Sequence, residues 1–111
     1  MQVYSRFVTA APASAAKGDA MPRFVIERNV PGACQLTADE LRAISAKSNA
    51  VVSGLGEPYT WIKSYVAGDK FYCVHEAESA EAIYRHAREG GFPADKVTEV
   101  AAEIGPHTGS G

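Results

Sequence analysis

The sequence predicts an α+β domain with the order strand, helix, strand, strand, helix, strand. Three observations support this prediction. Residues 61–77 are rich in aromatic and β-branched side chains and have the pattern of two strands with a tight turn between them. One amphipathic helical pattern lies on each side of this hairpin, and a single strand-like segment lies at each end, over residues 23–28 and 96–104. Two βαβ crossovers that share one antiparallel sheet form the ferredoxin-like arrangement, with both helices on one sheet face.

The strands are predicted from alternating side chains. In the first strand, Phe24 and Ile26 share one face and Glu27 lies on the other. In the hairpin, Gly68-Asp69 supplies the glycine that a type II′ turn requires at its first central position. Strict alternation along the second strand places one set of side chains on one face, Trp61, Lys63 and Tyr65, and the other set on the opposite face, Ile62, Ser64 and Val66.

The two helices are predicted from their ends and from their apolar stripes. The first begins at Thr37, whose spacing to Glu40 is that of a capping box, and it ends at Gly54. Its inward stripe is Leu41, Ile44, Ser48, Val51 and Leu55. The second follows Ser79, a good N-cap residue, and ends at the glycine pair 90–91. Its inward stripe is Ala82, Ile83, His86, Ala87 and Gly90.

Length and composition exclude several classes of protein. The chain has 111 residues, of which 46% are hydrophobic, and this is enough for one domain with a modest core. A formal charge of −2 gives no electrostatic footprint for nucleic acid, and no apolar run approaches the roughly 20 residues that span a bilayer. The two cysteines, Cys34 and Cys73, form no disulfide framework, so free thiols in a reducing cytoplasm are expected.

Composition also predicts the domain boundaries. Residues 1–20 are alanine-rich, and Pro12 and Gly18 interrupt any regular period, so we expect a disordered leader or an upstream segment there. The short apolar patch after Arg6 is too weak for a signal peptide. The folded domain is expected over residues 21–106, followed by a flexible tail over residues 107–111.

A sheet that is apolar on both faces needs a cover on each face. The two helices cover one face. The other face would lie open in a monomer, and an open apolar patch of this kind favours association. We therefore expect a homodimer in which the open sheet faces pair about a two-fold axis.

Candidate metal ligands lie on the third strand and the second helix. Cys73 and His75 are two residues apart on one strand, so their side chains project to the same face, roughly 6–7 Å apart at the backbone. This spacing suits two ligands of one metal, or a thiolate–imidazole pair. Imidazole, thiolate and carboxylate together suit nickel, zinc, copper or cobalt, and the spacing does not choose among these divalent transition metals. Alternatively, Cys73 is a small core residue and His75 is a strand-end residue near solvent. His86 on the inner helix stripe is either a ligand or a core histidine hydrogen-bonded to a polar neighbour. His107 is expected in the solvated tail.

Glu27, Trp61 and Tyr65 suggest a different kind of site. A charged residue among strand aromatics can line a small-molecule pocket between the sheet and the helices. In the alternative interpretation, Glu27 pairs with Lys63 or Arg28, and the aromatic side chains anchor a dimer interface. No glycine-rich phosphate loop, G-x-S-x-G or H-E-x-x-H motif is present, so nothing in the sequence points to a particular catalytic reaction.

Three stretches carry a resemblance to a known family: R-F-V-I-E-R, W-I-K-S-Y-V-A-G-D-K-F-Y-C-V-H-E-A and I-Y-R-H-A-R-E-G-G-F-P-A-D-K-V. They resemble a family of small bacterial proteins, one actinobacterial branch of which is described as nickel-binding. The resemblance covers residues 22 to about 106. It implies a ferredoxin-like homodimer of the dimeric α+β barrel type that binds nickel near its surface, for sequestration or tolerance, without established catalysis.

The resemblance also bears on the site residues. The positions that match recurring motif positions of the family are Glu27, Trp61, Tyr65, Cys73 and His86. His75 occupies a position that the motif leaves variable. The expected function is thus a homodimeric nickel-binding protein with His75, His86, Cys73 and Glu27 as candidate ligands. The alternatives are a binding or enzymatic pocket around Glu27, Trp61, Tyr65, Cys73 and His86, and an interaction module in which these residues only pack.

Overall fold

The central hairpin pairs along its whole length, as its aromatic and β-branched residues favour. In the computed structural model, which describes residues 21–110, it comprises β2 (Tyr59–Ala67) and β3 (Lys70–Ala77). Gly68-Asp69 joins the strands, with φ at 61° for Gly68, and no non-glycine residue in the described range has a positive φ. A positive φ confined to the first central residue is the pattern of a type II′ turn, so this prediction is confirmed.

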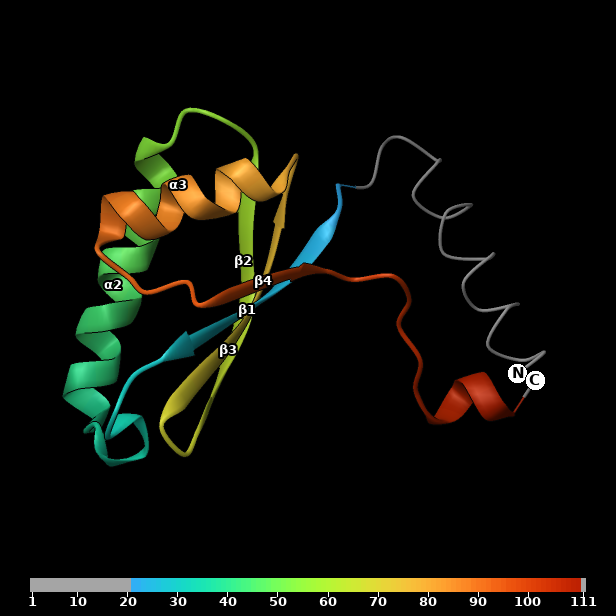
Figure 1. Ribbon diagram of the computed structural model, residues 1–111, viewed down its shortest axis with the longest axis horizontal. Helices are drawn as coiled ribbons and strands as arrows, with labels where there is room; N and C mark the ends of the chain where they lie inside the picture. Colours follow the sequence, from blue (N-terminus) through green and yellow to red (C-terminus); the bar gives the residue numbers. More distant parts are fainter. Residues whose placement is uncertain (1–20, 111) are drawn as a thin grey trace.

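The sheet has the strand order β2-β3-β1-β4, and every neighbouring pair is antiparallel. β1 (Arg23–Asn29) and β3 lie in the middle, and β4 (Lys96–Glu99) forms one edge. The predicted ferredoxin-like order is confirmed. The last strand is shorter than predicted, because β4 pairs only with β1 and β1 begins at Arg23. Beyond that point the chain runs away from the sheet to a short 3-10 helix, η2 (Pro106–Gly109) (Figure 1).

A β-bulge in β2 changes which side chains share a face. Trp61 pairs with His75 and Lys63 pairs with Val74, so Ile62 is an extra residue in the ladder. The prediction that side chains alternate strictly between the two faces of β2, with Trp61 and Tyr65 on the same face, is therefore wrong. Trp61 shares the helix-facing side with Ser64 and Val66, whereas the side chain of Tyr65 is 57% exposed on the other face.

Helix α2 (Ala38–Gly54) begins with the predicted capping box. The Thr37 hydroxyl accepts from the Glu40 amide at 3.1 Å, and the Glu40 carboxylate accepts from the Thr37 amide at 2.8 Å. Helix α3 (Ala80–Gly90) begins at Ser79, but this residue makes no side-chain capping hydrogen bond. The predicted inward stripe of α3 is confirmed, since all of its members are buried: Ala82, Ile83, His86, Ala87 and Gly90.

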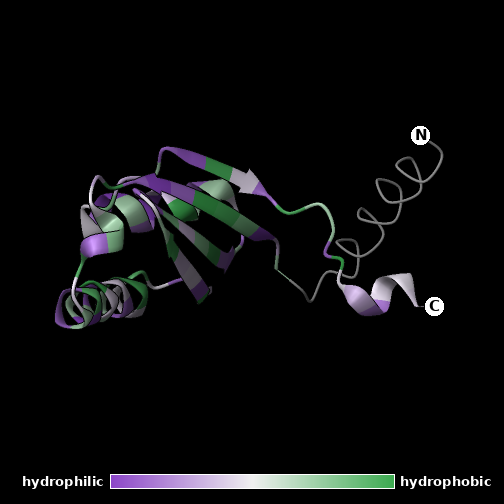
Figure 2. Ribbon diagram, turned by 90° about the horizontal axis from the view of Figure 1, so that it is seen from below, coloured by the Kyte–Doolittle hydropathy of each residue, from purple (hydrophilic) through white to green (hydrophobic). Residues whose placement is uncertain are grey.

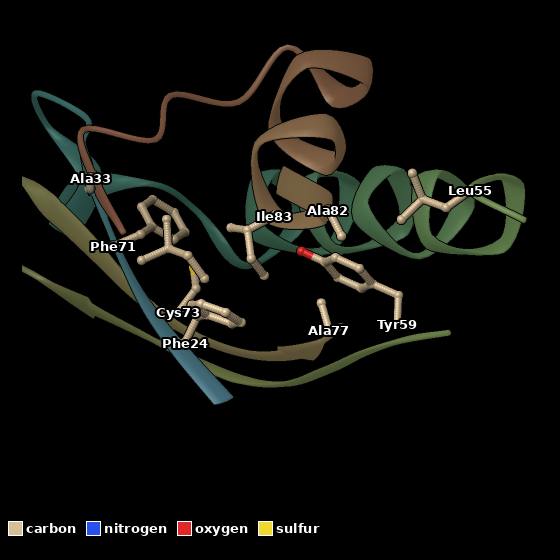
Figure 3. Packing of buried hydrophobic residues seen from close by; sticks show 10 residues of the cluster. Phe24, Ala33, Leu55, Tyr59, Phe71, Cys73, Ala77, Ala82 and Ile83 are labelled. Atoms are coloured by element: carbon tan, nitrogen blue, oxygen red, sulfur yellow. The ribbon is translucent and has the colours of Figure 1, made fainter. Parts of the chain in front are cut away.

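The core lies between α3 and one face of the sheet (Figure 3). Its residues come from β1, β2, β3, α3 and the segments that flank α2: Phe24, Ile26, Ala33, Leu55, Tyr59, Phe71, Cys73, Ala77, Ala82 and Ile83. Helix α2 packs less closely, because its apolar stripe is only half-buried and Ser48 is its one fully buried side chain. Figure 1 shows α2 crossing α3 beside the sheet. Space is therefore left between α2 and the sheet.

The tip of the hairpin holds the connection between β1 and α2, which includes the 3-10 helix η1 (Ala33–Gln35). The amide of Val30 donates to the Asp69 carbonyl at 2.8 Å, and the amide of Cys34 donates to the Gly68 carbonyl at 2.9 Å. The Asp69 carboxylate also accepts from the amide of Gly32 at 2.9 Å. The connection is thus fastened to the turn by three backbone donors.

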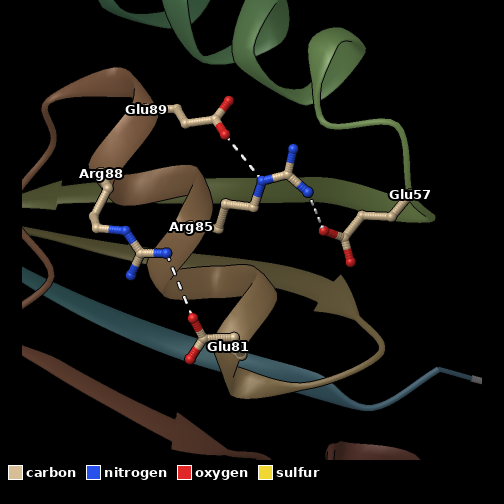
Figure 4. Close-up of polar contacts among 5 residues, drawn as sticks. All are labelled: Glu57, Glu81, Arg85, Arg88 and Glu89. Atoms are coloured by element: carbon tan, nitrogen blue, oxygen red, sulfur yellow. Dashed lines mark hydrogen bonds and ion pairs between the residues drawn. The ribbon is translucent and has the colours of Figure 1, made fainter.

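The strands carry both hydrophilic and hydrophobic residues (Figure 2). Along β3, half-buried and buried residues alternate. On α3, Arg85 bridges Glu57 before β2 and Glu89 one turn further along, at 2.7 and 2.9 Å (Figure 4). Such exposed pairs contribute little individually. No helix in residues 21–110 is long and apolar enough to cross a membrane.

Candidate functional site

A cavity of about 400 Å³ lies between α2 and the helix-facing side of the sheet. This volume falls within the range of small-molecule sites in proteins. The apolar part of its wall is Val30, Leu41, Ile44, Val66, Phe71, Phe92 and Pro93. The polar part of its wall is Arg28, Ser45, Ser48, Trp61, Ser64, Cys73, His75 and His86. The serines of α2 that line the cavity, Ser45 and Ser48, are small and do not fill this space.

His75 lies on the buried face of β3, the same face as Phe71, Cys73 and Ala77. The alternative interpretation that it lies near solvent is wrong, because His75 is 1% exposed. Its Nδ1 lies 2.5 Å from the hydroxyl of Tyr59. Burial, followed by the charges of His86 and Arg28, lowers the pKa of His75 to about 3. His75 is therefore a neutral imidazole at neutral pH.

His86 projects from α3 into the same region and is also 1% exposed. Its Nε2 lies 3.1 Å from the hydroxyl of Ser48 on α2, and its ring stacks between Tyr59 and Phe92 at centroid distances of 5.2 and 5.5 Å. Burial and the nearby charge of Arg28 lower the pKa of His86 to about 4. Its Nδ1 is a buried polar side-chain atom with no hydrogen-bond partner in the described part of the chain.

The two imidazoles lie close together. Their ring centroids are 5.1 Å apart in an edge-to-face arrangement. Both rings line the cavity, and both are unprotonated at neutral pH, which is the state in which imidazole accepts a hydrogen bond or binds a metal. The structure thus brings His75 and His86 together.

Cys73 lies on the same face of β3 and also lines the cavity. Its sulfur accepts a hydrogen bond from Nε of Arg28 at 3.4 Å. Cys73 is buried, and Cys34 is exposed in η1. Free thiols at both positions agree with the prediction of no disulfide.

Glu27 and Tyr65 lie away from this site. Glu27 alternates with the buried residues Ile26 and Arg28, so it faces the other side of the sheet. Its carboxylate pairs with Lys70 at 3.3 Å, and the predicted partners Lys63 and Arg28 are not used. The predicted pocket is therefore correct for Trp61, Cys73 and His86 and wrong for Glu27 and Tyr65.

The metal-ligand geometry is incomplete within one chain. Among residues 21–110, no group of three or more His, Cys, Asp or Glu side chains is arranged to hold a metal ion. A complete centre from His75, His86, Cys73 and Glu27 of one protomer therefore does not fit. The two neighbouring imidazoles fit part of a coordination shell.

Sequence reasoning missed two residues of the site, Arg28 and Tyr59. Both are buried, and Tyr59 is the hydrogen-bond partner of His75. Arg28 continues the alternation of Phe24 and Ile26, which places it on the inner face of β1. That alternation was the available signal, since an arginine in phase with two core residues indicates a buried charge.

The fold and the cavity define a small ferredoxin-like α+β protein with an internal ligand-sized space beside two buried histidines. Residues 24–100 match the family model of the SCO4226-like nickel responsive proteins, and the chain belongs to this family. Among solved structures, SCO4226 from Streptomyces coelicolor A3(2) matches with a TM-score of 0.62 and 27% sequence identity. The match covers 74% of this chain and 99% of that one. A comparison with curated proteins gives no match.

Family membership confirms the resemblance to a small nickel-related family and the ferredoxin-like fold. A nickel-related role is supported by the family description. The domain limits at residues 21–106 and the tail at residues 107–111 stay predictions. The predicted leader, residues 1–20, lies outside the described residues.

Proposed function

We propose that the protein binds nickel(II) as a homodimer and acts in sequestration of the metal or in tolerance to it. The observation that carries the proposal is the pair of neutral imidazoles, His75 and His86, with ring centroids 5.1 Å apart. Imidazole nitrogen is a preferred donor for nickel. The description of the family as nickel responsive supports the choice of metal.

The unpartnered Nδ1 of His86 supports a ligand role for this ring. Buried polar atoms are nearly always hydrogen-bonded, so one without a partner needs an explanation. A metal ion is one such explanation. Cys73 stays a candidate third donor, since it lies on the same strand face as His75. Any further donors would come from water or from the second protomer.

The open sheet face supports the homodimer. Val25 pairs with Val74 across β1 and β3, and Tyr65 pairs with Tyr72 across β2 and β3, on the face that no helix covers. The predicted ligand Glu27 lies on this face as well. In a homodimer formed through it, Glu27 would belong to the interface and not to the His75–His86 region.

Equilibrium dialysis against nickel tests the proposal. The wild-type chain is expected to take up nickel, and His75→Gln and His86→Gln are expected to weaken uptake at least tenfold. Glutamine is chosen because it fills similar space and keeps a hydrogen-bonding group. The matched control is His107→Gln, since His107 lies exposed in η2. Circular dichroism of each variant checks that it folds.

Two results would overturn the proposal. One is a wild-type protein that retains no nickel above the buffer. The other is loss of uptake in His107→Gln with no change in the His75 and His86 variants. Anomalous scattering from a nickel-soaked crystal of the wild-type protein tests the location independently, and an ion only at His107 would contradict the proposed site.

A second candidate function is the binding of a small organic molecule in the cavity. The observation that favours it is the cavity itself, which is about 400 Å³ in volume and whose wall surface is mostly apolar. Sites of this kind commonly combine an apolar wall with a few placed polar groups. This candidate needs no metal.

A further inference from the structure

Arg28 is a charged residue inside the protein. Its side chain lies on the inner face of β1, 5% exposed, in the wall of the cavity. A buried guanidinium is costly unless a counter-charge and hydrogen-bond acceptors compensate it. The groups that surround Arg28 therefore show whether its charge is compensated within the protein or is available to a ligand.

The partners of Arg28 in the described residues include no carboxylate. Nε donates to the sulfur of Cys73 at 3.4 Å, and Nη1 donates to the carbonyl of Pro93 at 2.6 Å. The guanidinium also lies over the Phe92 ring, 5.7 Å from its centroid. No ion pair within residues 21–110 includes Arg28. A guanidinium has five N–H donors, so three remain for another acceptor.

The other polar groups of the wall are largely engaged with each other. Trp61 donates to Ser64 at 2.9 Å, and Ser45 donates to the Leu41 carbonyl at 2.9 Å. Ser48 is engaged with His86 and Tyr59 with His75. Arg28 is thus the charged wall residue with donor capacity to spare, and Nδ1 of His86 is a further wall atom without a partner in the described residues. The guanidinium of Arg28 also places a positive charge in the wall of the cavity.

We propose that the cavity binds an organic monocarboxylate with an apolar body, whose carboxylate pairs with the guanidinium of Arg28. This inference rests on the cavity-binding candidate and is independent of nickel binding. The planar fork of arginine matches a carboxylate in two parallel hydrogen bonds. The apolar body would lie against the aliphatic and aromatic part of the wall, which includes Leu41, Ile44 and Phe92.

The charge of the site selects a monoanion. Arg28 is the one arginine or lysine of the cavity wall. A nucleotide or another polyanion would bring more negative charge than one guanidinium compensates. An apolar wall of this extent would also leave the polar body of a sugar or nucleotide without hydrogen-bond partners.

The fluorescence of Trp61 reports binding, because it is the one tryptophan of the chain and lies in the cavity wall. The probes are octanoate and octanamide, which share the apolar body and differ in charge. Titrations are carried out with the full chain in EDTA, so that nickel is absent. We expect octanoate to bind saturably and at least tenfold more tightly than octanamide.

Four variants separate the contributions. Arg28→Gln is expected to abolish the preference for octanoate, and Arg28→Lys to weaken it, since the charge stays and the fork is lost. Ile44→Phe is expected to weaken both probes by filling part of the cavity, and it adds no second tryptophan to the fluorescence signal. Arg42→Gln is the matched control, because Arg42 is an exposed arginine of α2 that pairs with Asp39, and the preference should be unchanged.

Cys73→Ser tests whether the sulfur of Cys73 competes as the partner of Arg28, and octanoate binding is expected to persist in this variant. The proposal is overturned if wild-type protein binds neither probe or binds both equally. It is also overturned if a folded Arg28→Gln keeps the preference. Because EDTA is present throughout, none of these results decides the nickel proposal.

Discussion

His75 and His86 are kept neutral by their surroundings, and no carboxylate forms an ion pair with either ring in the described residues. Both are buried, both lie near Arg28, and each bonds to a hydroxyl, from Tyr59 and Ser48 respectively. A hydroxyl serves as donor or acceptor and so satisfies a neutral ring without charging it. The site therefore supplies uncharged nitrogen donors at neutral pH.

These lowered pKa values predict acid destabilisation. Below the unfolded value of 6.5, histidines of the unfolded chain take up protons, while folded His75 and His86 stay neutral down to about 3 and about 4. The unfolded state then binds more protons, so the free energy of unfolding falls as pH falls from about 6.5. By pH 5 the expected loss is about 2 kcal/mol for each histidine. Urea unfolding at pH 7.5 and pH 5.0, in EDTA, measures it.

Two variants separate this effect from titration of the carboxylates. In His86→Gln the decrease in the free energy of unfolding from pH 7.5 to pH 5.0 should be smaller by about 2 kcal/mol, because the variant lacks one of the two proton-linked histidines. In His107→Gln this decrease in the free energy of unfolding should match that of the wild type, since His107 is exposed. Folded-state NMR that shows His75 or His86 titrating near pH 6.5 would contradict the prediction.

At this scale, sequence reasoning placed His86 and Cys73 correctly on inward-facing positions. It could not place His75, because position in a strand does not tell whether the strand end is covered. The cover comes from Tyr59 and Trp61 on β2, whose rings lie 5.3 and 6.5 Å from that of His75. These are contacts between strands and depend on register.

At the scale of the element, the end of α3 is coupled to the cavity through one ring. Gly90 is the last residue of α3, and a Cβ there would overlap Phe92, with Cδ2 2.6 Å away. Phe92 in turn stacks on His86 and lines the cavity. The glycine thus makes room for a ring that belongs to the site.

Gly90→Ala is expected to lower the free energy of unfolding by about 1–3 kcal/mol, because overpacking outweighs the better helix propensity of alanine. Gly54→Ala is the matched control. Gly54 is the last residue of α2, and a Cβ there meets no atom within 4 Å. This variant should be neutral or more stable by up to about 1 kcal/mol. Equal effects of the two substitutions in urea unfolding would refute the role of Phe92.

The elements differ in how well the sequence predicts them. The stripe of α3 and the capping box of α2 were predicted correctly, because both follow from spacing within one element. The bulge at Ile62 was missed, because the inserted residue is itself apolar and leaves no break in the pattern. The early end of β4 depends on where its pairing partner β1 begins, so it could not be predicted from the residues of β4 alone.

On the scale of the whole molecule, the open face of the sheet combines apolar and charged groups. Val25, Val74 and Tyr72 are half-buried there, and Tyr65 is exposed. Charged pairs flank them, with Arg23 bonded to Glu76 at 2.7 Å and Lys70 to Glu27 at 3.3 Å. An apolar centre with a charged rim is the usual composition of a protein–protein interface.

The full chain is therefore expected to sediment as a dimer at micromolar concentration. Tyr65→Lys should shift it to a monomer, because the substitution places a charge in the apolar part of the proposed interface. Tyr84→Lys on α3 is the control, since Tyr84 is 40% exposed on the opposite layer and should leave the dimer intact. A wild-type monomer, or dissociation caused only by Tyr84→Lys, would rule out pairing through the sheet.

The order of strands and helices was predictable for the whole molecule, because right-handed crossovers and antiparallel pairing leave few arrangements of six elements. The cavity was not predictable in the same way. It lies between α2 and the sheet, where small serine side chains of α2 leave space unfilled. The separation between α2 and the sheet follows from three-dimensional packing, and no periodic pattern in the sequence indicates it.

The turn between β2 and β3 has a consequence for engineering the protein. A hairpin tip is normally the first choice for inserting a tag or a reporter, because little depends on it. Here the backbone of Gly68 and Asp69 receives the amides of Val30 and Cys34. An insertion would release the connection that carries Val30 at the cavity wall, so fluorophores and affinity tags belong at the far end of the molecule, beyond Gly105.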